Sequence, residues 1–193
     1  KGRYDRECVH RILDAGLVAQ VAFVEDGNPV VVPMIYGRDG ETIYLHGAGK
    51  ARVIRMVEGS ERICLNVTLL DGIVLARSAF NSSMNYRSVT VFGRPSLVED
   101  SEEKLRAMKV ISEHLMPGRW DELRAPHENE VKMTGVIAVL IEAASAKVSA
   151  GMPVDEPDDY AIAVWAGVLP LTSQLQTLRD DDRLLPGVTA SVA

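Results

Sequence analysis

Apolar and polar residues alternate along much of this chain in short segments bounded by turn residues, a pattern typical of antiparallel strands. Two clusters of turn residues, Glu25-Asp26-Gly27-Asn28 and Gly37-Arg38-Asp39-Gly40, separate the first of these segments. The pattern predicts strands at Val18–Val24, Pro29–Tyr36, Thr42–His46, Arg62–Leu70, Ile73–Ala76 (after an Asp71-Gly72 turn), Tyr86–Val98, Thr134–Glu142 and from Lys147 onward. The strand from Tyr86 should break or end near Arg94-Pro95, because proline cannot donate to a ladder.

Helical spacing of apolar residues is found in fewer segments. It predicts a helix capped by Asp5 and ended by Gly16, a short one from about Lys50 to Val57, and one opened by Asp100 and Glu103 and ended by Pro117-Gly118. Many short strands and few helices predict a mainly β protein, a small β-barrel with peripheral helices. Alternating βαβ units, which a doubly wound sheet would require, are not apparent.

The C-terminal part has a different pattern. Gly151–Tyr160 is rich in proline and aspartate and is predicted to be a loop, and Trp165–Leu171 is an apolar docking segment. We expect one domain over residues 1–171, followed by a C-terminal tail over residues 172–193.

Length, composition and charge exclude several classes of protein. A chain of 193 residues with 47% hydrophobic and 25% charged residues is typical of one soluble globular domain. Its net charge of −6 argues against a general nucleic-acid binder. No apolar run is long enough to span a bilayer, and no signal segment is seen. Cys8 and Cys64 lie far apart, which favours reduced thiols in a cytoplasmic protein, with one disulfide as the alternative.

Within the stretch Leu75–Arg94, Arg77 and Arg87 are combined with a row of serines and asparagines that leads into an alternating strand. Such side chains must find partners if they are buried. This composition indicates a rigid element that presents cations and neutral hydrogen-bonding groups to a ligand.

A second polar feature is the turn Tyr44–Arg52, with the sequence YLHGAGKAR. Two glycines let the backbone turn closely, and Lys50 and Arg52 are expected in the first turn of the following helix, where an anion would balance them. The turn is therefore a candidate phosphate site, and a solvated turn with surface cations is the alternative. It is not a nucleotide P-loop, because Tyr44 and Ala51 stand where that motif needs Gly and Ser or Thr.

The histidines and serines predict neither a metal site nor a hydrolase. His10, His46, His114 and His127 have no paired metal-ligand spacing, and no GxSxG elbow exists. His46 differs from the others because it directly precedes the glycine turn, where it contacts either a ligand or the backbone. Pro33 inside the apolar run PVVVPMIY indicates an edge, a bulge or a backbone that faces a ligand.

In this order, these motifs resemble the pyridoxamine 5′-phosphate oxidase-like superfamily of FMN-binding split barrels, and within it the nitroimidazole-resistance-type branch. The resemblance extends from about Tyr4 to Leu171 and rests on the strand with Pro33, the YLHGAGKAR turn, LDGIVLARSAF…SMNYRSVTVFGR, EEK, PGRW, SAK and WAGVLPL. It implies an FMN-binding split-barrel domain and a homodimer with FMN at the subunit interface.

The resemblance also implies roles for individual residues. Val32, Pro33 and Met34 would lie along the flavin ring, and His46, Gly47 and Ala48 along the ribityl chain and phosphate. Lys50 and Arg52 would neutralise the phosphate. Ser88 would contact the flavin from the partner subunit, with Asn85 and Arg87 as supports, and Trp165 would lie near the ring or the mouth of the site. The Leu75–Arg94 stretch would then complete a composite site on the partner's glycine turn.

The implied function is electron transfer from a reduced donor to a small-molecule acceptor by an FMN-dependent oxidoreductase. The basic residues with which the oxidase proper grips its vitamin substrate have no convincing counterpart here. The alternatives are a non-catalytic carrier or sensor of flavin or haem, a deazaflavin-binding relative, and a barrel that has lost its ligand.

Overall fold

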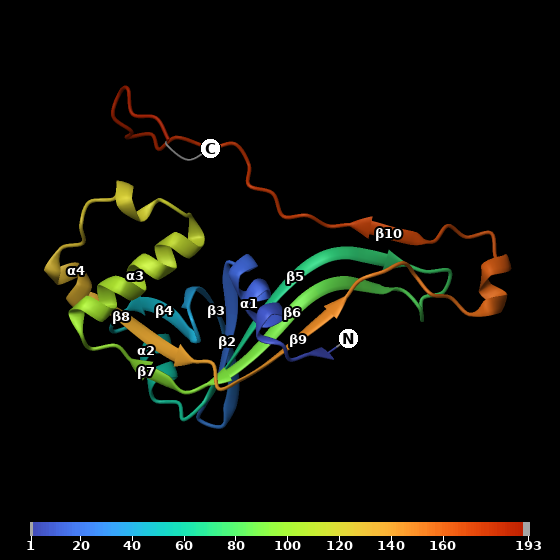
Figure 1. Cartoon of the computed structure of the whole chain (residues 1–193), viewed down its shortest axis with the longest axis horizontal. Coiled ribbons are helices and arrows are strands. Elements are labelled where there is room, and N and C mark those ends of the chain that lie inside the picture. Colours follow the sequence, from blue (N-terminus) through green and yellow to red (C-terminus); the bar gives the residue numbers. More distant parts are fainter. Residues whose placement is uncertain (1, 191–193) are drawn as a thin grey trace.

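The computed structural model describes residues 2–190 and consists of one long, strongly curved antiparallel sheet with helices packed around it (Figure 1). The strands are β1 (Gly2–Arg3), β2 (Val18–Glu25), β3 (Asn28–Asp39), β4 (Thr42–Ala48), β5 (Ile63–Leu75), β6 (Ser83–Gly93), β7 (Pro95–Leu97), β8 (Thr134–Leu140), β9 (Ala143–Ser149) and β10 (Gly167–Pro170). They pair in the order β1-β9-β6-β5-β2-β3-β4-β8-β7, and β10 adds to β5. The two ends of this order do not pair with each other, so the barrel is split, as the family resemblance implies.

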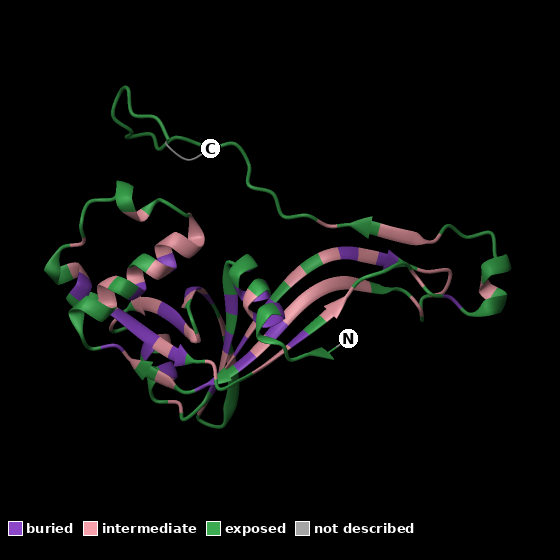
Figure 2. Ribbon diagram, in the orientation of Figure 1, coloured by how far each residue is buried: buried purple, intermediate pink, exposed green. Residues whose placement is uncertain are grey.

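The inner face of the sheet carries the main core. Alternate residues of the strands point inward and are fully buried, among them Val21, Leu45, Leu65 and Val91. Helices α1 (Arg6–Ala15) and α2 (Arg52–Glu58) add their apolar faces to the same core. Figure 2 shows buried positions on these helices and on the strands beside them.

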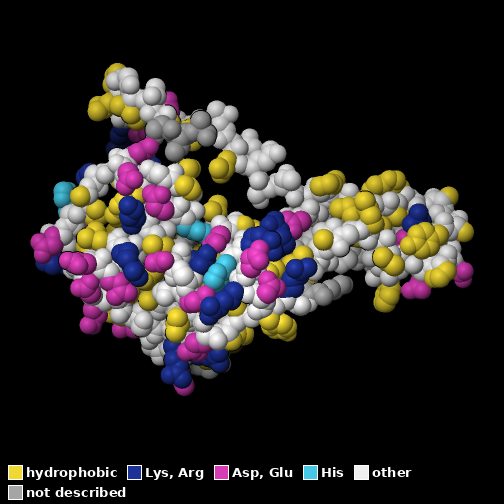
Figure 3. Space-filling view, viewed as in Figure 1, with side chains coloured by type: hydrophobic (Ala, Val, Ile, Leu, Met, Phe, Trp, Pro, Cys, Tyr) yellow, Lys and Arg dark blue, Asp and Glu magenta, His cyan; other side chains and the backbone are white. Residues whose placement is uncertain are grey.

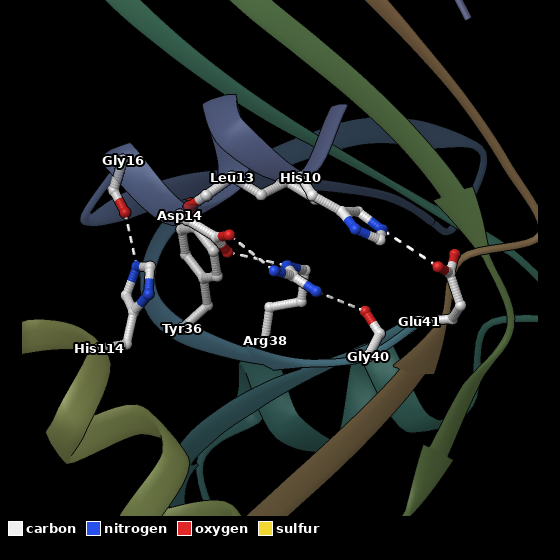
Figure 4. A network of polar contacts seen from close by, with 9 residues as sticks. All are labelled: His10, Leu13, Asp14, Gly16, Tyr36, Arg38, Gly40, Glu41 and His114. Atoms are coloured by element: carbon white, nitrogen blue, oxygen red, sulfur yellow. Dashed lines mark hydrogen bonds and ion pairs between the residues drawn. The ribbon is translucent and has the colours of Figure 1, made fainter. Parts of the chain in front are cut away.

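Polar contacts fix α1 to the strands and to helix α3 (Ser101–Leu115), as Figure 4 shows. The Tyr36 hydroxyl donates to the Leu13 carbonyl, and burial raises the pKa of that hydroxyl. The Nε2 of His114 lies 2.6 Å from the Gly16 carbonyl oxygen, and Arg38 holds both carboxylate oxygens of Asp14. The Tyr36 hydroxyl and the His114 imidazole, which lie against the core, therefore both have hydrogen-bond partners.

Helix α3 packs on the outward side of the sheet and covers only part of that side. It forms a second small core with Tyr44 and Val136, on the outward side of β4 and β8. Helix α3 also covers the second half of β3, from Ile35 onward. The adjoining outward side of β2, β5 and β6, together with β3 up to Pro33, has no helix over it (Figure 1). We call this uncovered surface the outer face; its central residues are Gln20, Pro33, Asn66, Thr68, Ser88 and Thr90, with Val18, Val24, Val31, Leu70 and Phe92 around them.

Far from the helices, β5, β6 and β10 extend into an arm together with residues 76–82 and 150–166 (Figure 1). The arm has few buried residues and many exposed apolar ones, including Phe80, Met152, Val154, Tyr160 and Trp165. Figures 2 and 3 show the exposure of this arm and the hydrophobic side chains gathered over its end. From residue 171 to residue 190 the chain runs back toward α3 without regular structure (Figure 1), and the domain boundary at residue 171 remains a prediction.

Several boundaries differ from the sequence prediction. Asp71-Gly72 is not a turn: β5 continues through it with a bulge, because Gly72 lies directly beneath β10, where a Cβ would be 2.9 Å from the Val168 side chain. Helix α2 begins at Arg52, so Lys50 precedes the helix instead of opening it. Strand β9 begins at Ala143, before the predicted start at Lys147.

Other predictions are confirmed, and some elements were not foreseen. Asp5 and Asp100 cap α1 and α3 by accepting from the backbone N–H groups of Cys8 and Glu103, each at 2.8 Å. The predicted break at Arg94 separates β6 from β7. Strand β1, helix α4 (Glu128–Met133) and the 3-10 helices η1 (Trp120–Glu122) and η2 (Pro157–Ala161) were missed, because such short elements carry little periodicity. None of the helices within residues 2–190 has the length and apolar character needed to cross a membrane.

Candidate functional site

The outer face has a polar centre. Register places Gln20 between Pro33 of β3 and Asn66 of β5, and Asn66 in turn opposite Thr90 of β6. Ser88 lies opposite Thr68, two residues further along the same two strands. Because side chains alternate between the faces of a sheet, these groups all project from the outer face. The row therefore brings two residues expected from the sequence, Pro33 and Ser88, to one surface.

Asn66 connects the polar groups of this row. Its Nδ2 lies 3.1 Å from the Ser88 hydroxyl, the Val89 carbonyl oxygen and the Thr90 hydroxyl. Thr68 donates to the Asn66 Oδ1 at 2.8 Å, and its hydroxyl oxygen is also 2.8 Å from that of Ser88. Ser88 is thus held in a network of hydrogen bonds and is not an isolated surface serine.

A cleft of ≈ 740 Å³ adjoins one end of the outer face. Cys64 and Phe92 of the outer face and Glu25 at the end of β2 line it, together with the residues that follow α2. Burial raises the pKa of the Cys64 thiol, so this thiol is held in its protonated form. The cleft links the outer face to the carboxylate that binds Arg52.

The glycine turn is closely packed. A Cβ on Gly47 would lie 3.2 Å from the Ile54 side chain, and one on Gly49 would lie 3.0 Å from the Met133 carbonyl oxygen, so both positions favour glycine. Ala48, between them, ends β4 and is exposed. The Lys50 amine projects into solvent and has no hydrogen bond or ion pair to any of residues 2–190.

Arg52 is not free. Both carboxylate oxygens of Glu25 accept from its guanidinium, Oε1 at 2.9 Å from Nε, and this hydrogen bonding raises the pKa of Arg52. Of the pair expected to neutralise a phosphate, Lys50 is therefore the available cation, and Arg52 would have to share its charge with Glu25.

The ring-lining candidates of β3 divide between the two faces of the sheet. Pro33 is exposed on the outer face, whereas Met34 is buried in the core and Val32 packs partly against it. His46 is half-buried on the outward side of β4, where burial lowers its pKa and favours the neutral imidazole. Within the described chain this imidazole has no hydrogen-bond or ion-pair partner.

The remaining candidates lie in or near the arm and make contacts within it. The Asn85 Nδ2 donates to the Gly151 carbonyl at 3.0 Å, and Arg87 binds both oxygens of Asp71, at 2.7 and 2.9 Å. This pairing raises the pKa of Arg87. Trp165 is 68% exposed and precedes β10 by two residues. It belongs to segment 150–166 of the arm, which lies far from α2 and the glycine turn before it (Figure 1).

The polar stretch that precedes β6 is largely structural. Arg77 donates to Asp155 from its backbone N–H at 2.8 Å and from Nη1 at 2.9 Å, and its guanidinium lies over the Tyr160 ring. Ser78 and Ser82 hydrogen-bond within the loop. The arginines that suggested a ligand-facing element thus have carboxylate partners in this chain.

Gln20, Asn66, Thr68 and Thr90 were missed by the sequence analysis. A signal was present, because polar residues at alternate positions of otherwise apolar strands mark one face of a sheet. Register alone brings these positions together, and register cannot be read from a single strand.

Comparison with known proteins identifies the family. The pyridoxamine 5′-phosphate oxidase family model matches residues 5–148. The comparison with curated protein sequences gives no match.

Two solved structures cover nearly the whole chain. The flavocytochrome Anf3 from Azotobacter vinelandii is 41% identical, with a TM-score of 0.92 over 98% of this chain and 88% of that one. The FAD and haem binding protein from Mycobacterium smegmatis is 35% identical, with a TM-score of 0.94 over 98% of this chain and 93% of that one.

A third structure, named as a 5-nitroimidazole antibiotic resistance protein from Bacteroides thetaiotaomicron, is 25% identical, with a TM-score of 0.64 over 76% of this chain and 86% of that one. The family model stops at residue 148, so a match over 98% of the chain also includes most of the arm and tail. With its split, open sheet and this match over most of its length, the chain belongs to the pyridoxamine 5′-phosphate oxidase-like superfamily of FMN-binding split barrels.

Proposed function

We propose that this protein is a homodimeric, flavin-dependent oxidoreductase whose flavin lies between the outer face of one subunit and the glycine turn of the other. The observation that carries the proposal is similarity over 98% of the chain to a flavocytochrome and to an FAD and haem binding protein. Bound flavin supplies the redox chemistry, and the protein binds, orients and shields it.

The residues present fit a flavin. A flavin has a flat apolar ring with a polar edge and carries a phosphate at the far end of its side chain. The outer face of one subunit offers apolar side chains around a polar centre, and the glycine turn of the other offers the exposed Lys50. Lys50 has no competing carboxylate, so its ammonium group suits a phosphate.

The flavin is FAD or FMN. The resemblance of the motifs implies FMN, whereas the full-length neighbour from Mycobacterium smegmatis is named as binding FAD. We favour FAD, because that neighbour matches 98% of this chain at 35% identity. Release of the cofactor and its separation by chromatography distinguishes the two flavins.

Haem is a second candidate cofactor, and a specific observation favours it. The neighbours named for haem or as a flavocytochrome extend over the arm and tail, while the nitroimidazole-resistance-type neighbour covers 76% of the chain. His46 supplies a neutral imidazole without a partner in the described chain, the kind of group that holds haem iron. The other histidines are engaged: His10 with Glu41, His114 with Gly16, and His127 as the cap of α4.

A homodimer is supported by the exposed apolar side chains of the outer face. Val24 is 68% exposed and Val31 58%, and further exposed apolar residues continue along the arm. Surfaces of this kind on a soluble protein are typical of binding interfaces. A second copy of the chain would cover them and bring its own Ser88 and Trp165 to the flavin.

Replacing Lys50 with alanine is expected to weaken flavin binding by about 10- to 100-fold, because a charge-assisted hydrogen bond to phosphate is worth roughly 1.5–3 kcal/mol. Arg52→Ala should have a smaller effect, since its charge is shared with Glu25. Titration of the flavin-free protein with FAD and with FMN, followed by flavin fluorescence, gives the affinities.

The control for this experiment is Arg55→Ala, which removes another exposed cation of α2 without a side-chain partner in the described chain. It should bind flavin like the wild type. Equal flavin affinities for the Lys50 variant and this control would show that the flavin phosphate does not bind at the glycine turn.

A further inference from the structure

The network beneath Ser88 has a fixed direction of hydrogen bonding, which begins with the amide of Asn66. An amide can be turned so that either its oxygen or its nitrogen faces a given neighbour. Here the Val89 carbonyl oxygen lies 3.1 Å away and can only accept, so the nitrogen must face it. The amide oxygen is therefore directed to Thr68.

The hydroxyl hydrogens follow from that orientation. Asn66 Oδ1 has no hydrogen, so Thr68 donates to it and has no hydrogen left for Ser88. The 2.8 Å contact between the two hydroxyl oxygens is then a bond donated by Ser88. Asn66 donates back to Ser88 from Nδ2 and closes the circle.

Asn66, Thr68 and Ser88 thus form a ring in which every bond points the same way round, and such rings strengthen cooperatively. All hydroxyl hydrogens in the ring are used within it. What Ser88 can present to a ligand on the outer face is a lone pair. To donate instead, Ser88 would have to break its bond to Thr68.

We propose that Asn66 and Thr68 are positioning residues that make Ser88 a hydrogen-bond acceptor for the N3–H group of the flavin ring. N3–H is the ring N–H group of an oxidised flavin, so it is the partner that an acceptor on this face requires. This inference rests on the proposed flavin site and adds to it the edge of the ring that meets Ser88. Thr68 acts through Ser88 and need not contact the flavin.

The test compares Thr68→Val with Thr90→Val. Both substitutions remove a hydroxyl that contacts Asn66 on the outer face, but Thr90 lies outside the ring. Flavin labelled with ¹⁵N at N3 is bound to each variant, and the N3–H proton resonance and the affinity are measured. Ser88→Ala removes the acceptor itself and gives the change in resonance and affinity that corresponds to complete loss of this hydrogen bond.

In Thr68→Val the hydrogen of Ser88 has no internal acceptor and turns toward the ligand, where it opposes N3–H. We expect the N3–H resonance to move upfield, as in Ser88→Ala, and flavin affinity to fall by about 3- to 10-fold, the value of one hydrogen bond. Thr90→Val leaves the ring intact, so its N3–H resonance should stay at the wild-type position, and its affinity measures the loss of a hydroxyl outside the ring. Circular dichroism establishes that each variant is folded.

The outcomes separate this inference from the proposed function. Flavin bound by the wild type, with the same N3–H resonance in Thr68→Val and Thr90→Val, overturns the role of the ring and leaves flavin binding in place. A wild-type protein that takes up neither FAD nor FMN overturns both.

Discussion

Replacing Asp155 with alanine is expected to lower the melting temperature by about 10 °C and to loosen the arm. The Asp155 side chain is fully buried and binds both the backbone and the guanidinium of Arg77. Removing one partner of a buried ion pair leaves the other charge uncompensated, which costs about 3–5 kcal/mol. In a chain of this size each kcal/mol corresponds to about 2–4 °C.

The loss should be local to the arm. Arg77 joins the β5–β6 loop to residues 151–160 through Asp155 and through its contact with the Tyr160 ring. Hydrogen exchange should therefore speed up in residues 75–83 and 151–169 and remain slow in the inner core. Asp158→Ala, an exposed acid of the same segment with no side-chain partner in the described chain, is the matched control. Equal melting temperatures for the two variants would mean that the Arg77 pair does not hold the arm.

Replacing Val31 with glutamate is expected to convert a dimer to a monomer and to reduce flavin affinity at least tenfold. Val31 is 58% exposed in one chain and lies among the apolar side chains of the outer face. Enclosing an unpaired carboxylate in an interface costs several kcal/mol, enough to raise the dimer dissociation constant by about 100-fold or more. Flavin affinity should fall with it, because the proposed site takes Ser88 from the second subunit.

Sedimentation analysis gives the mass of each species. The wild type should sediment at twice the 21.1 kDa of the chain and the Val31→Glu variant at that mass itself. Leu123→Glu places the same charge at an exposed leucine away from the outer face and should remain dimeric. A wild type that is monomeric at micromolar concentration, or a dimeric Val31 variant with unchanged flavin affinity, would contradict the proposed interface.

Much of the fold follows from local chemistry in the sequence. The alternation in VAQVAFV and the turn at Asp26-Gly27 suffice to define β2 and its hairpin with β3, and Asp5 and Asp100 cap their helices as their side-chain chemistry suggests. The predicted turn at Asp71-Gly72 was wrong because the same dipeptide fits both a hairpin turn and a β-bulge. Contact with β10 decides between them, and β10 lies far along the chain.

The candidate site shows the same limit. Arg77 looked available for a ligand because Asp155, its partner, is 78 residues away in the sequence. Arg52 looked free for a phosphate because Glu25, at the end of β2, is 27 residues away in the sequence. Ser88 was recognised by its resemblance to a family position, whereas Asn66 and Thr68 gain their meaning from the register of β5 with β6. Pairings across strands therefore determine which polar side chains remain available to a ligand.

The absorbance spectrum of the full-length protein purified from cells, recorded before and after anaerobic addition of NADH or NADPH, tests the central claim most directly. The account predicts the absorbance bands of an oxidised flavin, which bleach with a reduced donor and return when a quinone or nitroaromatic acceptor is added. A Soret band beside them would establish the haem. A colourless protein that takes up no added FAD or FMN would contradict the account.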